Sequence, residues 1–154
     1  MRNAVTALLL SAYGFVLSYL TLSPHTANRQ PAAACLRLVP GRNIAAFLAA
    51  GGWPMVLNVL GNLAAFVPLG VLWPLLRRGR TSAWGVAGLS ASVSLLIESL
   101  QFASRRRIAD VDDIILNTLG GLLGYAAYRA VGFLGKSLAT RCRQSRSSGT
   151  GSSG

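Results

Sequence analysis

The sequence WPMVLNVLGNLAAFVPLGVLWPLL, residues 53–76, contains no charged side chain in 24 consecutive positions. An α-helix rises about 1.5 Å per residue, so this stretch is long enough to cross the roughly 30 Å hydrocarbon core of a bilayer. An uncharged apolar stretch of this length is typical of a transmembrane helix. Residues 53–76 are therefore predicted to form a membrane span.

Three other stretches are also apolar and long enough to cross a bilayer. Together the four predict an all-α fold, an integral membrane four-helix bundle, with spans at residues 4–22, 53–76, 82–104 and 113–134. Residues 44–52 are apolar but too short to span, which favours an interfacial or re-entrant segment. The membrane domain is predicted to cover residues 1–136, and a flexible, basic, Ser/Gly-containing tail is predicted for residues 137–154.

Composition supports a membrane protein over a soluble one. The 154 residues are 52% hydrophobic and only 12% charged, whereas a soluble domain usually has about 25% charged residues. The net charge of +11 could suggest nucleic-acid binding. However, the basic residues fall in short groups between apolar stretches, as topology determinants do, so nucleic acid is not expected as a partner.

The basic residues also predict an orientation, because Lys and Arg accumulate in cytoplasmic loops. Eight of them fall at the N-terminus, in the tight 77–80 connection and in the tail, and six fall in the two loops of the opposite side. This bias predicts that both termini are cytoplasmic (N-in/C-in). A cleaved secretory signal is the competing interpretation of the first 22 residues. A retained helix is favoured because Cys35, the one candidate lipoprotein cysteine, lies 13 positions beyond the apolar stretch.

All four acidic residues of the chain lie in the segment IESLQFASRRRIADVDDIILN, residues 97–117, beside Arg105–Arg107. Intramembrane polar residues occur in pairs spaced three or four positions apart, so each pair shares a helix face. The pairs are Asn58 with Asn62, Glu98 with Gln101, and Asp113 with Asn117. In the four-span arrangement, all three pairs lie near the same membrane surface, which is the outer one in the predicted orientation.

A carboxylate about 10 Å inside hydrocarbon is costly unless it is paired, so it should face other helices or a wet cavity. Glu98 with Arg107 is the expected charged centre, while Asp110 and Asp113 should hold the loop and the start of the last span. Hydrogen bonding between helices is one explanation of these residues. A functional polar pocket is the favoured one, because the six intramembrane polar groups exceed what helix packing requires. Close packing itself is indicated by Gly120 and Gly124, spaced as small-xxx-small.

No standard catalytic or metal-binding pattern is present. His25 is the single histidine, and no nucleophile–base pair can be assigned. Asp110, Asp112 and Asp113 lack the Gly-centred spacing and distal Glu of a calcium loop, although a cation held by them stays an alternative. We therefore expect no catalytic residue, no metal site and no cofactor.

Three motifs resemble those of the VanZ-like membrane proteins. The first is N-x-x-G-N-x-x-x-F-x-P-L-G at Asn58, Gly61, Asn62, Phe66, Pro68, Leu69 and Gly70. The second is I-E-x-x-Q at Ile97, Glu98 and Gln101. The third is R-x-x-D-x-D-D-x-x-x-N-x-x-G at Arg107, Asp110, Asp112, Asp113, Asn117 and Gly120.

The resemblance implies a small multi-pass protein of the bacterial inner membrane, from a family associated with teicoplanin-type glycopeptide resistance. Its expected partners are the bilayer and a ligand such as a lipid-linked or cell-wall precursor or a lipoglycopeptide. The predicted pocket comprises Asn58, Asn62, Glu98, Gln101, Arg107, Asp110, Asp113 and Asn117. The main alternative is a membrane enzyme for a lipid-linked substrate, with Glu98 or Asp113 as general base. A small transporter is disfavoured because the cytoplasmic half has no matching polar set.

Overall fold

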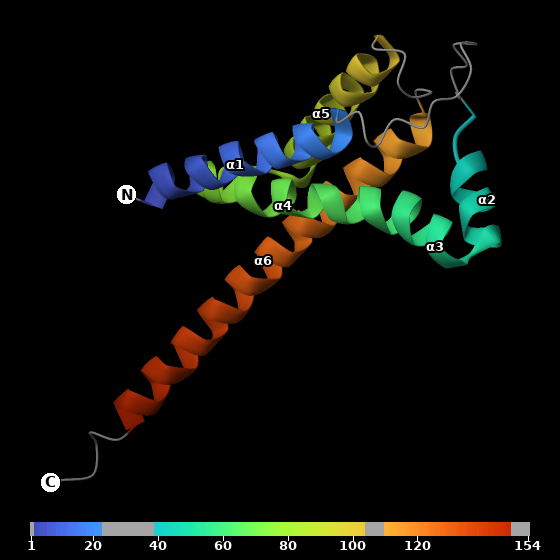
Figure 1. Ribbon diagram of the computed structural model, residues 1–154. Helices are drawn as coiled ribbons and strands as arrows, with labels where there is room; N and C mark the ends of the chain where they lie inside the picture. The colour runs from blue at the N-terminus through green and yellow to red at the C-terminus, as the bar shows by residue number, and fades with distance from the viewer. Residues whose placement is uncertain (1, 23–38, 104–109, 149–154) are drawn as a thin grey trace, which may run out of the picture.

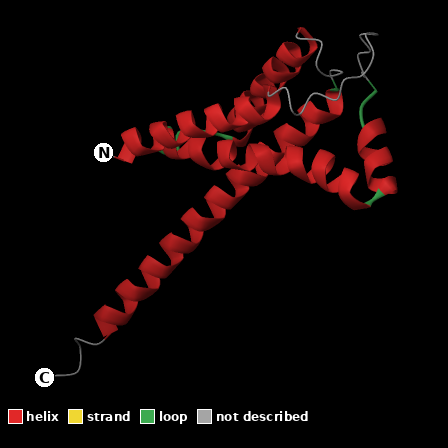
Figure 2. Cartoon of the chain, in the orientation of Figure 1, coloured by secondary structure: helices red, strands yellow, loops and turns green. Residues whose placement is uncertain are grey.

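The computed structural model of the protein describes residues 2–22, 39–103 and 110–148. Within these ranges the chain is helical apart from short turns, and no strand is present (Figure 2). The all-α class predicted from the apolar stretches is therefore confirmed for this part of the chain.

Each predicted span lies in a region where the described residues are helical, although the helix bounds differ. α1 is Arg2–Leu22, α5 is Ala83–Ala103 and α6 is Val111–Ser148. The predicted second span is built from three consecutive segments: α3 (Gly52–Met55), a π-helical turn (Val56–Leu60) and α4 (Gly61–Leu76). The short apolar segment of the first loop forms a separate helix, α2 (Arg42–Ala50), beside α3 at one end of the molecule (Figure 1). Gly51 and Gly52 join the two at φ values of 59° and 62°, which glycine adopts without steric cost.

α6 is longer than a membrane span. Its 38 residues continue to Ser148, past residue 136, where the membrane domain was predicted to end and a flexible tail to begin. At about 1.5 Å per residue the helix is close to 57 Å long. Its C-terminal half extends away from the other helices (Figure 1).

Glycines bring α4 and α6 into close contact where they cross. A Cβ atom at Gly120 would overlap the carbonyl oxygen of Leu63, and one at Gly124 would overlap that of Val67. From the other side, a Cβ at Gly70 would overlap the carbonyl oxygen of Gly121. The predicted small-xxx-small face of the last span is therefore the face on which the two backbones touch.

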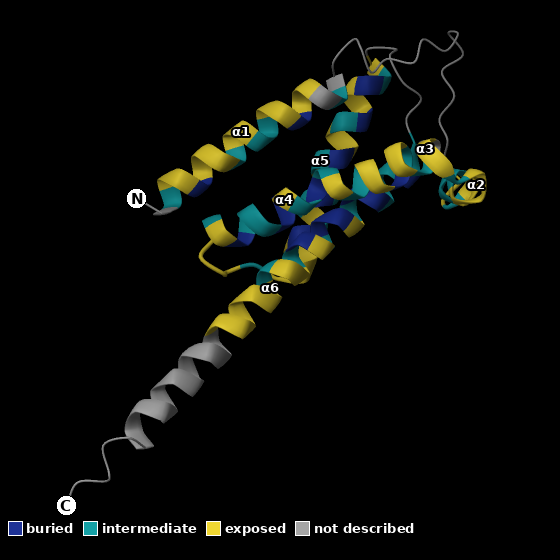
Figure 3. Cartoon of the chain, turned by 60° about the horizontal axis from the view of Figure 1, so that its bottom comes forward, coloured by how far each residue is buried: buried dark blue, intermediate teal, exposed yellow. Residues whose placement is uncertain are grey.

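The buried residues gather around this crossing (Figure 3). α5 contributes Val86, Ser90 and Ser94, each with no exposed surface. A Cβ at Gly121 would overlap the hydroxyl of Ser90, so α5 also approaches α6 closely.

α1 covers α4 on its other side. Leu17 of α1 joins Phe66 and Leu69 of α4 in a small apolar core. The hydroxyl of Tyr13 donates to the carbonyl oxygen of Ala65 at 2.8 Å, which fixes the two helices relative to one another.

The outer surface of these helices is strongly apolar. Leu8, Phe15, Leu96 and Val131, for example, are each more than half exposed. Two helical segments among the described residues are long and apolar enough to cross a membrane, Val56–Leu76 and Ala83–Ala103. Asn3–Tyr19 is apolar but shorter.

Candidate functional site: a polar cluster at one end of the helices

The N-terminus of α6 is capped by the carboxylate of Asp110. Asp110 immediately precedes the helix, and its Oδ1 accepts a hydrogen bond from the backbone N–H of Asp112 at 3.0 Å. This is the usual N-cap bond, which satisfies one of the N–H groups that a helix start leaves free. The backbone N–H of Asp110 in turn donates to Oε2 of Glu98 at 3.1 Å. The end of α5 is therefore tied directly to the start of α6.

Asp112 caps a second helix, α2, across the molecule. Its Oδ1 accepts from the N–H of Gly41 at 2.6 Å, and its Oδ2 accepts from the N–H groups of Asn43 at 2.9 Å and Ile44 at 3.1 Å. α2 has no capping side chain of its own, because Gly41 occupies its N-cap position. One carboxylate, 2% exposed, thus satisfies three backbone donors and complements the positive end of the α2 dipole.

An amide strengthens the link between α2 and α6. Nδ2 of Asn43 donates to Oδ2 of Asp110. The N-termini of α2 and α6 therefore face each other, with the carboxylates of Asp110 and Asp112 between them. This arrangement explains how negative side chains are accommodated there: two helix N-termini and an amide face them.

The second span reaches the same cluster through Asn62. Its Nδ2 donates to Oδ1 of Asp113 at 2.6 Å, a short bond of the charge-assisted kind. Asn58 lies one turn earlier, within the π-helical turn Val56–Leu60. Single π-helical turns inside α-helices are frequent at functional sites.

Gln101 and Asn117 bond to neighbouring helices away from the carboxylates. Nε2 of Gln101 donates to the carbonyl oxygen of Thr21 at the end of α1 at 2.7 Å. Nδ2 of Asn117 donates to the hydroxyl of Ser94 at 2.8 Å, deep between α5 and α6. The Oδ1 atom of Asn117, whose residue is 6% exposed, has no hydrogen-bond partner among the described residues.

Four of the predicted pocket residues contact one another in two pairs, Asn62 with Asp113 and Glu98 with Asp110. The structure places the predicted residues that it describes near one end of α4, α5 and α6: Asn58, Asn62, Glu98, Gln101, Asp110, Asp113 and Asn117. Arg107, the expected partner of Glu98, lies outside the described residues. We call Asn43, Asn62, Glu98, Asp110, Asp112 and Asp113 the polar cluster.

Two members of the polar cluster were missed as site residues from sequence. Asp112 was noted only as part of a motif and as one of three acids that could alternatively hold a cation, although it makes more of the bonds above than any other side chain of the cluster. The alternation D-x-D-D was a usable sign, because acids at the first turn of a helix are expected to cap something. Asn43 gave no sign in the sequence, since its role depends on where the first loop folds back.

The chemistry of the polar cluster is that of hydrogen-bond acceptors held rigidly by amides and backbone N–H groups. Among the described residues, no three His, Cys, Asp or Glu side chains are arranged to hold a metal ion. Glu98 is only 5% exposed, so its carboxylate lies in the interior of an apolar helical protein. Carboxylates in such surroundings mark functional sites more often than packing contacts.

The part of the chain that the structure describes is helical, with apolar outer faces, two segments long and apolar enough to cross a membrane, and a buried acidic cluster, and these features are typical of membrane proteins. The VanZ/LLP1 family profile matches residues 6–134. The chain therefore belongs to the VanZ/LLP1 family, and its resemblance to the VanZ-like proteins is confirmed. No curated protein sequence and no solved structure gives a significant match to the chain.

Proposed function

We propose that the chain is a multi-pass protein of the bacterial inner membrane, with four spans formed by α1, Val56–Leu76, α5 and the first part of α6. Both termini are cytoplasmic in this proposal, which places the polar cluster near the outer surface. Support comes from the apolar outer faces of the helices and from the family match. The distribution of Lys and Arg along the sequence supports the orientation.

In this proposal the polar cluster binds the polar part of an envelope component, and the protein thereby modulates sensitivity to teicoplanin-type glycopeptides. The observation that carries it is the burial of Glu98, which is 5% exposed and hydrogen-bonded to the start of α6. A carboxylate inside the bilayer raises the free energy of a membrane helix by several kcal/mol unless it is paired. The ligand class is a lipid-linked or cell-wall precursor or a lipoglycopeptide, whose amide and hydroxyl groups suit carboxylate acceptors.

We further propose that the protein acts by binding and not by catalysis. In this proposal the two carboxylates that could serve as general bases act only as hydrogen-bond acceptors held in fixed positions. Asp113 accepts from Asn62 at 2.6 Å, and Glu98 accepts from the backbone of Asp110 at 3.1 Å. Incubating the purified protein in detergent with lipid-linked precursors should give no product by mass spectrometry, whereas turnover lost in Glu98→Gln would favour the enzyme.

The cellular test is expression of the chain in a teicoplanin-sensitive bacterial host. Wild type should raise the teicoplanin concentration that inhibits growth, and Glu98→Gln and Asp113→Asn should abolish that effect. Ser99→Ala is the matched control on α5, because its exposed hydroxyl bonds only to its own helix at Leu95. Membrane levels of all variants are measured by immunoblot. Full protection by both acid variants at normal membrane levels would contradict the proposal.

A further inference from the structure

The opposite end of the molecule carries a compact basic group. The turn between α4 and α5, residues 77–80, contains Arg77, Arg78 and Arg80, all exposed. We call it the basic turn. Arg129 of α6 lies beside it, because Tyr125, one helical turn earlier, donates its hydroxyl to the carbonyl oxygen of Thr81 at 3.1 Å.

Neutral groups position these guanidinium groups. Arg77 lies over the ring of Trp73, with its Cζ 5.9 Å from the ring centroid. Arg129 lies over the ring of Tyr125 at 6.0 Å and donates from Nη1 to its hydroxyl at 3.2 Å. An indole and a phenol orient the arginines without neutralising them.

Arg78 is held in the same way by an amide. In the amide orientation that satisfies both residues, the side-chain oxygen of Asn3 accepts from Nε and Nη2 of Arg78, at 3.2 Å each. The start of α1 therefore also contributes to this end of the molecule.

No acidic residue of the chain is near enough to compensate the charge. The four acids all lie between residues 98 and 113. Along α5, Glu98 is 15 residues from Ala83, and along α6, Asp113 is 16 residues from Arg129, which are separations of about 22 and 24 Å. Both separations far exceed the roughly 4 Å at which an arginine and a carboxylate form an ion pair.

The backbone of the basic turn places an arginine at a position where glycine is usual. α4 ends in a Schellman motif: the N–H of Gly79 donates to the carbonyl of Pro74 at 2.8 Å, and that of Arg78 to Leu75 at 3.3 Å. The residue after the C-cap of such a motif is left-handed and is usually Gly. Here it is Arg78, at φ 52°. Backbone strain of this kind clusters at ligand-binding and active sites.

We propose that the basic turn and Arg129 form a binding site for the phosphate headgroup of an anionic membrane phospholipid. The occupant is a lipid because the turn joins two segments that can cross a membrane, Val56–Leu76 and Ala83–Ala103. Trp84, 87% exposed at the start of α5, is placed as an interfacial aromatic residue and sets the turn at headgroup level. The site does not depend on the polar cluster or on its proposed role.

The test is lipid retention by the full chain in neutral detergent, measured by native mass spectrometry with phosphatidylglycerol and, separately, phosphatidylcholine. Wild type should retain phosphatidylglycerol and not phosphatidylcholine. A triple variant, Arg77→Gln, Arg78→Gln and Arg80→Gln, should bind phosphatidylglycerol on the order of 100-fold more weakly, since each arginine near an anionic surface contributes about fivefold. The charge-matched control, Arg29→Gln, Arg37→Gln and Arg42→Gln, removes the same charge from sequence positions outside the basic turn and should bind like wild type.

Two further measurements, on an Arg78→Gly variant and on competition by inorganic phosphate, test the role of Arg78 and the identity of the ligand. Arg78→Gly relieves the left-handed strain, so it should be at least as stable as wild type yet bind phosphatidylglycerol about fivefold more weakly. Inorganic phosphate should displace the lipid no better than chloride at equal ionic strength. Equal losses in the two triple variants would show a response to net charge alone and overturn the proposal. Displacement by phosphate at millimolar concentration would overturn the lipid as the occupant.

Discussion

Asp112 shows what the clustered acids do at the scale of single residues. A helix start leaves several N–H groups without partners, and this carboxylate satisfies three of them at the start of α2. Asp110 satisfies one such group at the start of α6, the N–H of Asp112, and Glu98 accepts from the backbone N–H of Asp110 itself. The concentration of acids in residues 97–117 therefore reflects the meeting of two helix starts with the end of α5.

Replacing Asp112 with Ala should release the start of α2. Three donors lose their acceptor, so the free energy of unfolding in detergent should fall by about 2 kcal/mol. Amide hydrogen exchange at Asn43 and Ile44 should accelerate, while exchange in the middle of α5 should not change. Asp112→Asn, which keeps one acceptor oxygen, should lose less. Unchanged exchange at both amides would show that the cap does not hold α2.

The hydrogen bond between Ser94 and Asn117 contributes a coupling energy that can be measured. The two side chains bond at 2.8 Å between α5 and α6. Hydrogen bonds between membrane helices contribute about 0.6 kcal/mol on average. A double-mutant cycle with Ser94→Ala and Asn117→Ala should give a coupling energy of about that size in denaturation by sodium dodecyl sulfate. A coupling energy of zero would mean that Asn117 acts independently of Ser94.

At the scale of elements, the crossing of α4 and α6 depends on glycines that permit backbone contact. Gly120→Ala would place a methyl group against the carbonyl oxygen of Leu63. The helices must then separate, and the variant should lose about 1 to 3 kcal/mol of stability. Gly132→Ala is the control on the same helix, because a Cβ there meets nothing within 4 Å.

The control should be neutral or slightly stabilising, by up to about 1 kcal/mol, since Ala has the higher helix propensity. Thermal unfolding of both variants in the same detergent separates the two effects. If Gly120→Ala and Gly132→Ala behave alike, the close crossing does not contribute to stability.

Much at this scale was predictable from sequence, because apolar stretches and small-residue spacing are local properties. The helices fall on the predicted spans, and Gly120 and Gly124 lie on the packing face. The capping of α2 by Asp112 was not predictable, since it joins residues about 70 positions apart. The continuation of α6 to Ser148 was also not foreseen. The end of an apolar stretch predicts where a chain leaves the bilayer, but a helix can continue beyond that point.

For the whole molecule, the two native cysteines test the proposed orientation. Cys35 lies in the first loop and Cys142 near the end of the chain, so the proposal puts them on opposite sides of the membrane. A membrane-impermeant maleimide applied to intact cells should label Cys142→Ser, which retains Cys35, and should label Cys35→Ser only after permeabilisation. The reverse pattern would invert the proposed topology, and labelling of both in intact cells would contradict the three spans proposed between the two cysteines.

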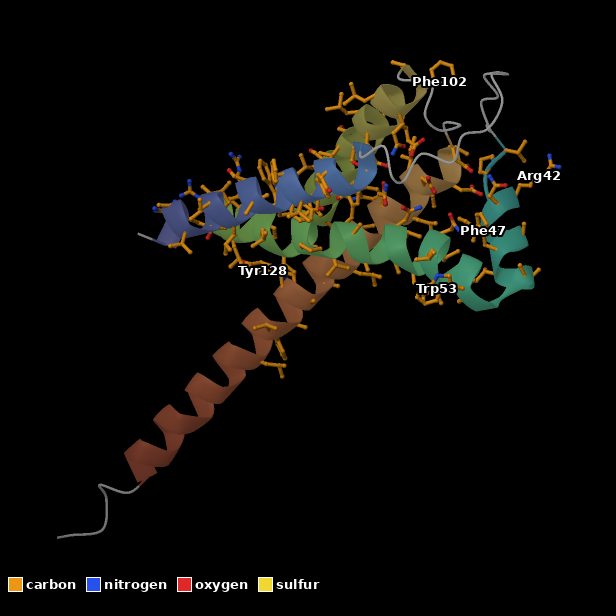
Figure 4. All side chains as sticks on the ribbon, in the orientation of Figure 1. Arg42, Phe47, Trp53, Phe102 and Tyr128 are labelled. Carbon is orange, nitrogen blue, oxygen red and sulfur yellow. The ribbon has the colours of Figure 1, made fainter. Side chains whose placement is uncertain are left out.

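The whole molecule is also polarised in charge. Its acids lie at the end where α2, α5 and α6 meet, and the basic turn lies at the other (Figures 1 and 4). Arg42, by contrast, points away from the helices at the acidic end (Figure 4). The two proposals together assign recognition of an envelope component to one end and contact with anionic lipid to the other.

The most direct test of the polar cluster is the set of lipids and precursors that copurify with the protein from native membranes. Wild type and Ser99→Ala should retain a polar envelope component, identified by mass spectrometry of extracts, that Glu98→Gln and Asp113→Asn lack at equal yield. Identical copurifying molecules in all four proteins would contradict a ligand-binding role for the cluster and leave its acids as helix caps alone.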